Sequence, residues 1–252
     1  MPTPAPAKDP ADTSLRKQVY DSLREALTAG RFAPGQKVTF RYVAGALGVS
    51  LTPVREALRR LVAEGAFEMH PNRSVRVPLM TRNKVLELRD MRMEMEGLAS
   101  GKAALVATRN QIAGIRRAAR EIIVARNRGD SATDRQKVRE FHFAVYAAAG
   151  QPTLLRLIEG LWLQTGPYMN LLYPDFISSS RGPAGRQRLI EALQARNASA
   201  ARREMADDIR RALSYVADLA DENGNIAPAA PATAPKRRSQ PAGAAAFELQ
   251  AN

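Results

Sequence analysis

The chain has 252 residues, of which 45% are hydrophobic and 25% are charged, so it has enough apolar residues for a globular core. It has no cysteine and only two histidines, which excludes disulfide frameworks, thiolate metal sites and multi-histidine metal sites. The formal net charge of +13 favours nucleic acid as a partner. Because no apolar run approaches the ~20 residues of a membrane span and no secretion signal opens the chain, we expect a cytoplasmic protein without a membrane partner.

Composition divides the chain into four parts. The Pro- and Ala-rich ends, residues 1–12 and 225–252, have few large apolar side chains and are expected to be disordered. Residues 13–78 hold eleven basic and five acidic residues, a net charge of +6 on less than half the length of residues 79–221, which carry +7. Residues 13–78 are therefore the better candidate for binding nucleic acid. The basic run Lys236–Arg238 has two interpretations, a contact to DNA phosphates or, more simply, part of a solubilising tail.

The first of the two larger segments predicts three short helices followed by a β-hairpin. Apolar residues recur every four positions from Leu15 and predict a helix that ends near Gly30. A second helix should begin after its cap Thr39 and a third after its cap Ser50, with a short connection that contains glycine between them. Two helices joined in this way form a helix-turn-helix. Residues 67–77 then predict two strands around a basic turn, so we expect a winged helix-turn-helix whose third helix enters the major groove of DNA.

A resemblance to the winged-helix domain of the GntR family of transcription regulators covers residues 14–78. It rests on two stretches, GRFAPG at 30–35 and GVSLTPVREALRRLVAEG at 48–65. The resemblance implies that DNA is contacted from the start of the second helix, the first turn of the third helix and the tip of the wing. The residues at those positions are Arg41, Ser50, Leu51, Thr52, Pro53, Arg55, Pro71, Asn72 and Arg73.

Two positions depart from the family pattern. Leu51 stands where most members carry arginine, which reads guanine through two hydrogen bonds, so we expect weaker or altered readout of that base. Ser74 stands where many members carry glycine in the wing. The alternative interpretation of Arg41 and Arg55 is a solvated helix face, with Arg55 held by a neighbour such as Glu56.

Residues 79–224 are predicted to form an all-helical domain that binds an effector and dimerises. Helical periodicity runs through the segment without a strand pattern, with a break at Gly166 and a loop over 174–185. Four polar residues lie on stripes that should face the interior, and these are Arg92, His142, Arg186 and Asp208. Internal pairing, for example Arg92 with Glu96 or Arg186 with Asp208, and a ligand cavity between helices explain them equally well.

This segment is also similar to the FadR C-terminal domain of one GntR subfamily. The similarity rests on RMEME at 92–96, FH at 141–142 with AAGQ after it, and MADDI at 205–209. The resemblance implies a helical bundle that binds small carboxylic acids, often through a metal held by one aspartate and three histidines. The residues at those four positions are Val138, His142, Arg186 and Asp208.

Two potential ligands are too few for a tight divalent site, so we expect no metal cofactor. Arg186 would instead supply the positive charge, since a guanidinium binds carboxylates through two parallel hydrogen bonds. The sequence thus predicts a mostly α-helical repressor that binds operator DNA as a homodimer and a small carboxylate through the four inward polar residues.

Two other classes of function are compatible with parts of this sequence. An enzyme would use His142 and Asp208 as an acid–base pair, but no nucleophile motif, phosphate-binding loop or metal cage accompanies them. An architectural DNA-binding protein would bind through phosphate contacts without sequence preference, and it would not need charged residues inside a helical bundle.

Overall fold

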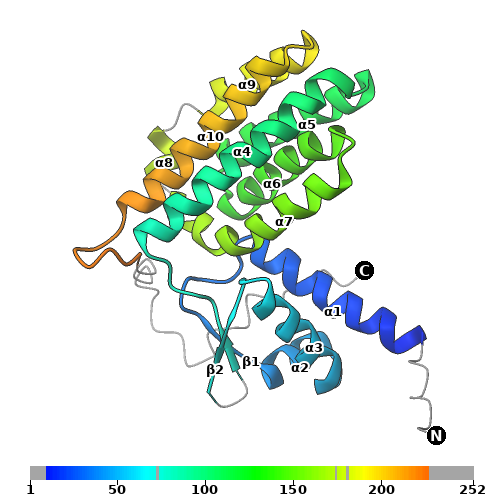
Figure 1. Cartoon of the computed structure of the whole chain (residues 1–252), viewed down its shortest axis with the longest axis vertical. Helices are drawn as coiled ribbons and strands as arrows, with labels where there is room; N and C mark the ends of the chain where they lie inside the picture. Colours follow the sequence, from blue (N-terminus) through cyan, green and yellow to red (C-terminus); the bar gives the residue numbers. More distant parts are fainter. Residues whose placement is uncertain (1–9, 72–73, 174, 180–181, 227–252) are drawn as a thin grey trace, which may run out of the picture.

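The computed structural model describes residues 10–71, 74–173, 175–179 and 182–226, and it consists mainly of helices (Figure 1). The N-terminal part contains α1 (Pro10–Thr28), β1 (Lys37–Thr39), α2 (Phe40–Leu47), α3 (Leu51–Ala63), β2 (Glu68–His70) and β3 (Ser74–Arg76). The C-terminal part contains α4 (Arg82–Val106), α5 (Arg109–Asn127), α6 (Ser131–Ala148), α7 (Pro152–Thr165), the 3₁₀-helix η1 (Gly166–Leu172), α8 (Asp175–Ser179), α9 (Gly182–Gln194) and α10 (Ala198–Asp218).

The N-terminal part is a winged helix-turn-helix, as predicted, with one more strand than expected. Gly48 ends α2 with a φ of 65°, a conformation that glycine adopts without strain. Thr39 caps α2, because its hydroxyl accepts a hydrogen bond from the Tyr42 amide at 3.1 Å. Ser50 is the N-cap residue of α3, but its side chain makes no capping bond to the described backbone. The additional strand β1 gives an antiparallel sheet in the order β1–β3–β2.

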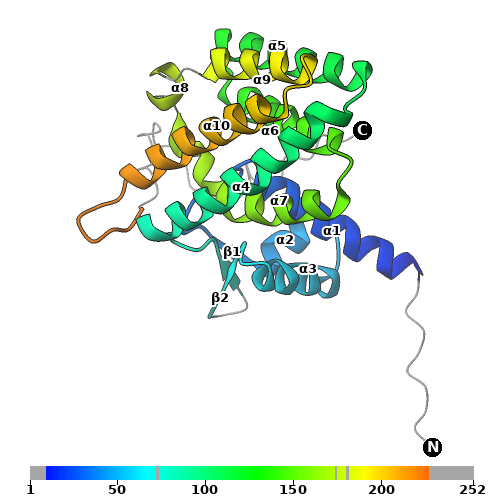
Figure 2. The ribbon, with the colours of Figure 1, turned by 45° about the horizontal axis from the view of Figure 1, so that its top comes forward.

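The C-terminal part is a helical bundle in which α4 and α10 lie side by side (Figures 1 and 2). The two helices approach closely at Gly101, where a β-carbon would lie 3.2 Å from the carbonyl oxygen of Ala198. A capping box begins α5, in which Thr108 and Gln111 each bond the other's backbone amide through the side chain. The predicted break at Gly166 is the start of η1.

Two stretches differ from the sequence prediction. The segment 174–185, predicted to be a loop, contains α8, and α9 begins at Gly182 instead of Arg186. With only five residues, α8 is too short to produce a helical apolar pattern in the sequence. Its Phe176 ring packs against the Tyr215 ring of α10 with 5.1 Å between centroids, so tertiary contact holds a segment that local signals do not reveal.

Both ends of the folded region extend beyond the predicted limits. Helix α1 begins at Pro10, within the segment predicted to be disordered. Ile226 is buried and its amide donates to the Met80 carbonyl at 3.0 Å, so the helical domain continues past residue 224. Among the described residues, no helix combines the length and apolar character that crossing a membrane requires. The segments outside the described residues are 1–9, 72–73, 174, 180–181 and 227–252.

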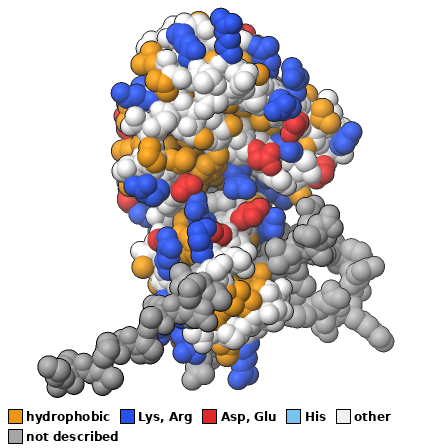
Figure 3. All heavy atoms as spheres, turned by 90° about the vertical axis from the view of Figure 1, so that its right-hand side faces the viewer, with side chains coloured by type: hydrophobic (Ala, Val, Ile, Leu, Met, Phe, Trp, Pro, Cys, Tyr) orange, Lys and Arg blue, Asp and Glu red, His pale blue; other side chains and the backbone are white. Residues whose placement is uncertain are grey.

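The two parts of the chain meet where the C-terminal half of α1 lies against α7 (Figure 2). Leu163 of α7 is buried in the apolar core of the N-terminal domain. Arg24 of α1 forms an ion pair with Glu159 of α7 at 2.6 Å, and Arg139 of α6 lies 3.9 Å from Glu25. Figure 3 shows acidic and basic side chains beside one another in the middle of the molecule. Apolar packing and ion pairs therefore both join the domains.

Candidate functional site

The first turn of α3 forms an exposed edge of the N-terminal domain. Leu51 is 38% exposed, and Thr52 and Arg55 are exposed beside it on the same turn of helix. Ser50 just before them is exposed, as is Arg41 on α2. Pro53, in contrast, is buried. It lies behind this surface at the start of the helix, so its place in the predicted DNA-contacting set stays a prediction.

The two candidate DNA-contacting arginines keep their charge available. Glu56, the acidic neighbour of Arg55, pairs instead with Arg16 of α1 at 2.7 Å. Across the described part of the chain, neither Arg41 nor Arg55 forms an ion pair with an acidic side chain. The alternative in which Glu56 neutralises Arg55 is therefore not the arrangement of this structure, and both guanidinium groups are free to bind phosphates or base edges.

The wing shows what replaces the family's glycine at position 74. Ser74 is buried, and its hydroxyl donates to the carbonyl oxygen of Pro71 at 2.6 Å, which joins the first residue of β3 to the residue that follows β2. Pro71 itself is exposed. The predicted tip residues Asn72 and Arg73 lie outside the described residues.

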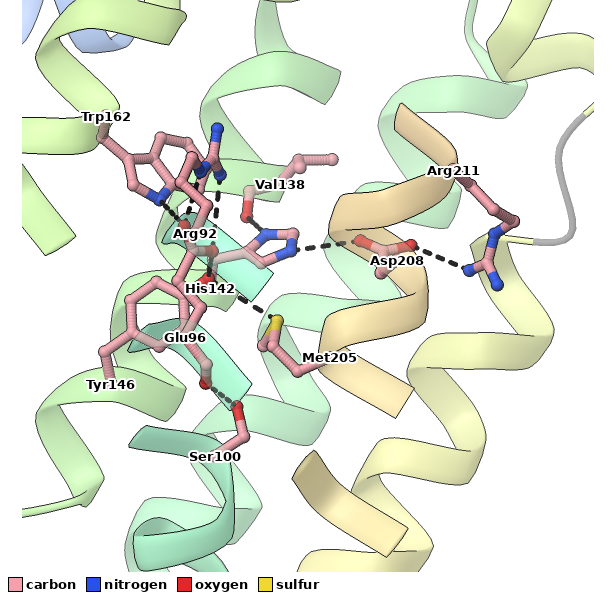
Figure 4. Close-up of polar contacts among 10 residues, drawn as sticks. All are labelled: Arg92, Glu96, Ser100, Val138, His142, Tyr146, Trp162, Met205, Asp208 and Arg211. Atoms are coloured by element: carbon pink, nitrogen blue, oxygen red, sulfur yellow. Dashed lines mark hydrogen bonds and ion pairs between the residues drawn. The ribbon is translucent and has the colours of Figure 1, made fainter. Parts of the chain in front are cut away.

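In the helical domain, Arg92 belongs to a buried polar cluster (Figure 4). Its Nε donates to Glu96 at 2.5 Å and its Nη1 donates to the Thr165 hydroxyl at 2.8 Å. The guanidinium also lies 4.4 Å from the ring centroid of Trp162. Trp162 and Tyr146 each donate a hydrogen bond to the Glu96 carboxylate. Internal pairing therefore accounts for Arg92, whose guanidinium has its partners within this cluster.

His142 and Asp208 form a second polar pair (Figure 4). His142 Nδ1 donates to the Val138 carbonyl at 2.8 Å, and Nε2 lies 3.2 Å from Asp208 Oδ2. Arg211 donates to the other carboxylate oxygen at 3.1 Å. Desolvation raises the pKa of Asp208, but the hydrogen bond and charge of His142, together with Arg186 and Arg211, outweigh it and lower the pKa to about 2. Asp208 is therefore ionised at neutral pH.

A cavity of about 70 Å³ lies beside Asp208 and is bounded by α5, α6, η1, α8, α9 and α10. Most of its wall is apolar, and its polar lining is dominated by guanidinium groups. The apolar and aromatic lining residues are Val138, Met169, Leu172, Tyr173, Phe176, Ile177 and Ala212. The charged lining residues are Arg126, Arg135, Arg186, Arg211 and Asp208. The lining therefore contains four cations and one carboxylate, a balance of charge that would favour an anion over a cation.

The guanidinium of Arg186 contains a buried donor without a partner. Arg186 is only 7% exposed, and its Nη2 is buried with no hydrogen-bond partner among the described residues. Burial lowers the pKa of Arg186, an effect that the charge of Asp208 opposes and that of Arg126 reinforces. The Nε of Arg135 is likewise buried without a partner in the described structure. Such donors destabilise a folded protein unless water or a ligand satisfies them.

A larger and more open pocket of about 240 Å³ adjoins this cavity, and the two share Arg126, Tyr173 and Ile177. The Tyr173 hydroxyl donates to Asp134 at 2.8 Å, and Arg126 donates to the same carboxylate. Burial and the charge of Asp134 raise the pKa of Tyr173, so the hydroxyl keeps its proton. Tyr173 therefore forms a wall between the outer pocket and the inner cavity.

The structure thus brings Arg186 and Asp208 to one cavity, with His142 behind Asp208, and it separates Arg92 from them. Sequence reasoning missed Arg126, Arg135 and Arg211. Two of these had a local signal: Arg135 lies three positions before Val138 on α6, and Arg211 lies three positions after Asp208 on α10.

The residues present do not fit the divalent metal that the resembled domain often holds. Of the four ligand positions, Val138 offers no donor side chain and Arg186 is a cation. His142 and Asp208 are bonded to each other, and Arg211 occupies the second oxygen of Asp208. Within the described ranges, no group of three His, Asp or Glu side chains is arranged to hold a metal ion.

Comparisons with known proteins agree on the family. Residues 15–77 match the family model described as bacterial regulatory proteins, gntR family, and residues 87–211 match the FCD domain model. Together the two models account for the winged helix-turn-helix and for most of the helical bundle.

Individual relatives support this match. The transcriptional regulator McbR of Escherichia coli is 32% identical over 160 residues, which are 64% of this chain and 72% of McbR. A probable D-xylose utilization operon transcriptional repressor of Paenarthrobacter nicotinovorans is 26% identical over 85% of this chain and 92% of its own length. The solved structure of E. coli McbR/YncC superposes with a TM-score of 0.75 at 28% identity, covering 80% of this chain and 96% of that one. The chain therefore belongs to the GntR family of transcription regulators, and its helical domain is an FCD domain of the FadR-like branch.

Proposed function

We propose that this regulator is a repressor that binds its operator as a homodimer and releases it when a small organic acid occupies the cavity beside Arg186. The observation that carries the proposal is the buried Arg186 guanidinium, whose Nη2 has no hydrogen-bond partner in the described structure. A carboxylate would satisfy both its charge and its planar pair of donors.

The charge of the cavity supports an anion over a neutral ligand. Arg126 is paired with Asp134 at 3.1 Å and Arg211 with Asp208, which leaves Arg135 and Arg186 without an acidic partner among the described residues. Two guanidinium groups that lack an ion-pair partner favour a ligand with one or two carboxylates, and the apolar wall favours a short carbon skeleton between or beside them. The acid would bind without a metal, because Arg186 stands in a metal-ligand position.

The role of repressor is proposed by analogy with the P. nicotinovorans relative, which is a probable transcriptional repressor. An acid releases DNA only if it binds the DNA-incompetent arrangement of the domains more tightly than the competent one. The proposed DNA contacts are those whose side chains are exposed on the first turns of α2 and α3, with Arg41 and Arg55 as the principal cations.

Helix α4 offers a surface for the second copy of the chain. Met91, Leu98 and Leu105 are spaced seven apart on one face and are 37%, 38% and 57% exposed. Antiparallel pairing of two α4 helices about Leu98 would place Met91 against Leu105 and Glu94 against Lys102, so apolar and charged groups would both be complementary. Sedimentation velocity should show a dimer for the wild type and for the control Leu157→Glu on α7, and a monomer for Leu98→Glu. A dimeric Leu98→Glu variant would place the interface elsewhere.

A melting-temperature screen tests the ligand class. The panel contains short mono- and dicarboxylic acids, each beside its neutral amide, and the variants are Arg186→Gln and the control Arg188→Gln. Arg188 lies on the same helix but is exposed and pairs with Glu204 at 2.9 Å. At a hundredfold excess over its dissociation constant, an acid should stabilise the wild type and Arg188→Gln by about 2.7 kcal/mol and leave Arg186→Gln unchanged. Stabilisation by the amides alone would refute the proposal.

A further inference from the structure

The 3₁₀-helix η1 touches the cavity with one face and the DNA-binding domain with another. Met169 and Leu172 of η1 line the cavity, and Tyr173, the next residue, lines both the cavity and the outer pocket. With seven residues, η1 is longer than most 3₁₀-helices, whose hydrogen bonds are poorer than those of an α-helix. A segment of this kind changes conformation at lower cost than the α-helices around it.

The other face of η1 lies against the C-terminal end of α1. The Asn170 side-chain amide donates to the carbonyl oxygen of Gly30, which lies two residues after the last residue of α1. Gly166 packs so closely that a β-carbon there would lie 2.9 Å from the Cα of Thr28 and closer still to the carbonyl oxygen of Leu27. The contact is therefore between backbones, and it is so close that η1 cannot move toward α1 unless α1 moves as well.

Helix α1 is in turn bonded to the recognition helix α3 and the residue that follows it. Arg16 pairs with Glu56 of α3 at 2.7 Å, and the Tyr20 hydroxyl donates to Glu64 at 2.8 Å. Arg60 of α3 lies 3.8 Å from the Tyr20 ring centroid. These contacts would carry a displacement at the C-terminal end of α1 to the helix that contains Arg55.

The size of the cavity makes movement of its wall necessary. Ligand pockets usually measure about 300–1,000 Å³, whereas this cavity measures about 70 Å³. An acid larger than a few atoms enters only if part of the wall is displaced. Met169 and Leu172 are apolar wall residues of η1, and η1 is the wall segment that also contacts α1 through Asn170 and Gly166.

We propose that η1 couples the cavity to the DNA-binding domain, with Asn170 as the positioning residue that links it to Gly30 at the end of α1. This inference rests on the proposed function, because the wall that η1 contributes belongs to the cavity in which the acid would bind. Coupling is reciprocal, so binding of DNA must alter η1 as much as movement of η1 alters DNA binding. The coupling can therefore be measured with DNA alone, before any acid is identified.

Hydrogen–deuterium exchange with mass spectrometry tests the coupling. The probe is an operator duplex selected by the wild-type protein from a randomised pool. The variants are Asn170→Ala and the near-isosteric Asn170→Leu, and the control is Glu159→Gln, which removes the Arg24 ion pair between α1 and α7 without touching η1. Melting temperatures verify that each variant is folded, and Asn170→Leu serves if Asn170→Ala does not fold.

In the wild type and in Glu159→Gln, saturating duplex should change amide exchange across residues 166–173 by about fivefold or more, the lower end of usual coupling factors. In the folded Asn170 variants, the duplex should bind with similar affinity while that change disappears. A wild-type η1 that does not respond to DNA, or Asn170 variants that respond like the wild type, would overturn the inference. So would loss of DNA binding in a folded Asn170 variant, because η1 would then hold α1 in place instead of coupling it.

Failure of the η1 coupling and failure of the proposed function give different experimental results. Absence of any stabilising acid in the melting screen would reject the effector while leaving the response of η1 to DNA intact. If an acid binds at Arg186 but DNA does not change the amide exchange of η1, only the coupling through η1 is rejected.

Discussion

Replacing Arg92 with methionine should destabilise the helical domain by about 3–5 kcal/mol, the usual cost of removing one partner from a buried ion pair. Arg92 is 2% exposed and Glu96 is fully buried, so the substitution leaves a carboxylate in the core without its cation. Glu96 keeps the hydrogen bonds from Tyr146 and Trp162, which do not compensate its charge. The loss of the cation–π contact with Trp162 adds to the cost.

Urea unfolding followed by the fluorescence of Trp162, the only tryptophan of the chain, measures this cost in the helical domain. The control is Arg202→Met, which removes an exposed ion pair with Glu94 and should cost less than about 1 kcal/mol. The double variant Arg92→Met/Glu96→Leu should cost less than Arg92→Met alone, since no charge then stays unpaired. If Arg92→Met costs no more than the control, the structural role of this pair is wrong.

Three further predictions concern DNA binding and pH. Arg55→Ala should weaken operator binding by ~1–3 kcal/mol at fixed salt, while Arg116→Ala in the helical domain should not; equal affinities in a titration would remove Arg55 from the interface. Leu51→Arg should change the preferred base at one position of each half-site, and an unchanged profile of selected sequences would show that position 51 does not face a base. Because the pKa of Asp208 is lowered to about 2, its ionised form stabilises the fold above pH ~4, and this contribution, roughly 2 kcal/mol, is lost as the pH falls toward 2. Asp208→Asn should reduce that acid dependence of unfolding, and an identical pH profile would contradict the assignment.

The winged helix-turn-helix could be predicted because its signals are local. The cap at Thr39 and the turn at Gly48 lie within a few residues of the helices that they limit. Strand β1 has only three residues, and its partner lies far along the chain, with Lys37 opposite Arg76. No local pattern predicts such a pairing, so β1 could be identified only from the structure.

The cavity could be predicted only in part, because periodicity shows which face of a helix a residue occupies and not what it contacts. Arg92 and Arg186 both lie on inward stripes, but Arg92 finds Glu96 one turn along its own helix, whereas Arg186 finds no such partner. Arg126 reaches the cavity through a long side chain, and a helical pattern does not determine where the end of such a side chain lies.

The most direct test of the account is the affinity of the operator duplex, measured by fluorescence anisotropy with and without the acid that stabilises the protein most. The acid should weaken binding by about tenfold or more in the wild type and in Arg188→Gln. Arg186→Gln should bind the duplex as the wild type does without the acid and should keep that affinity when the acid is added. Release of DNA from Arg186→Gln at the same acid concentration, or wild-type binding that the acid leaves unchanged, would contradict the claim that an acid held by Arg186 controls DNA binding.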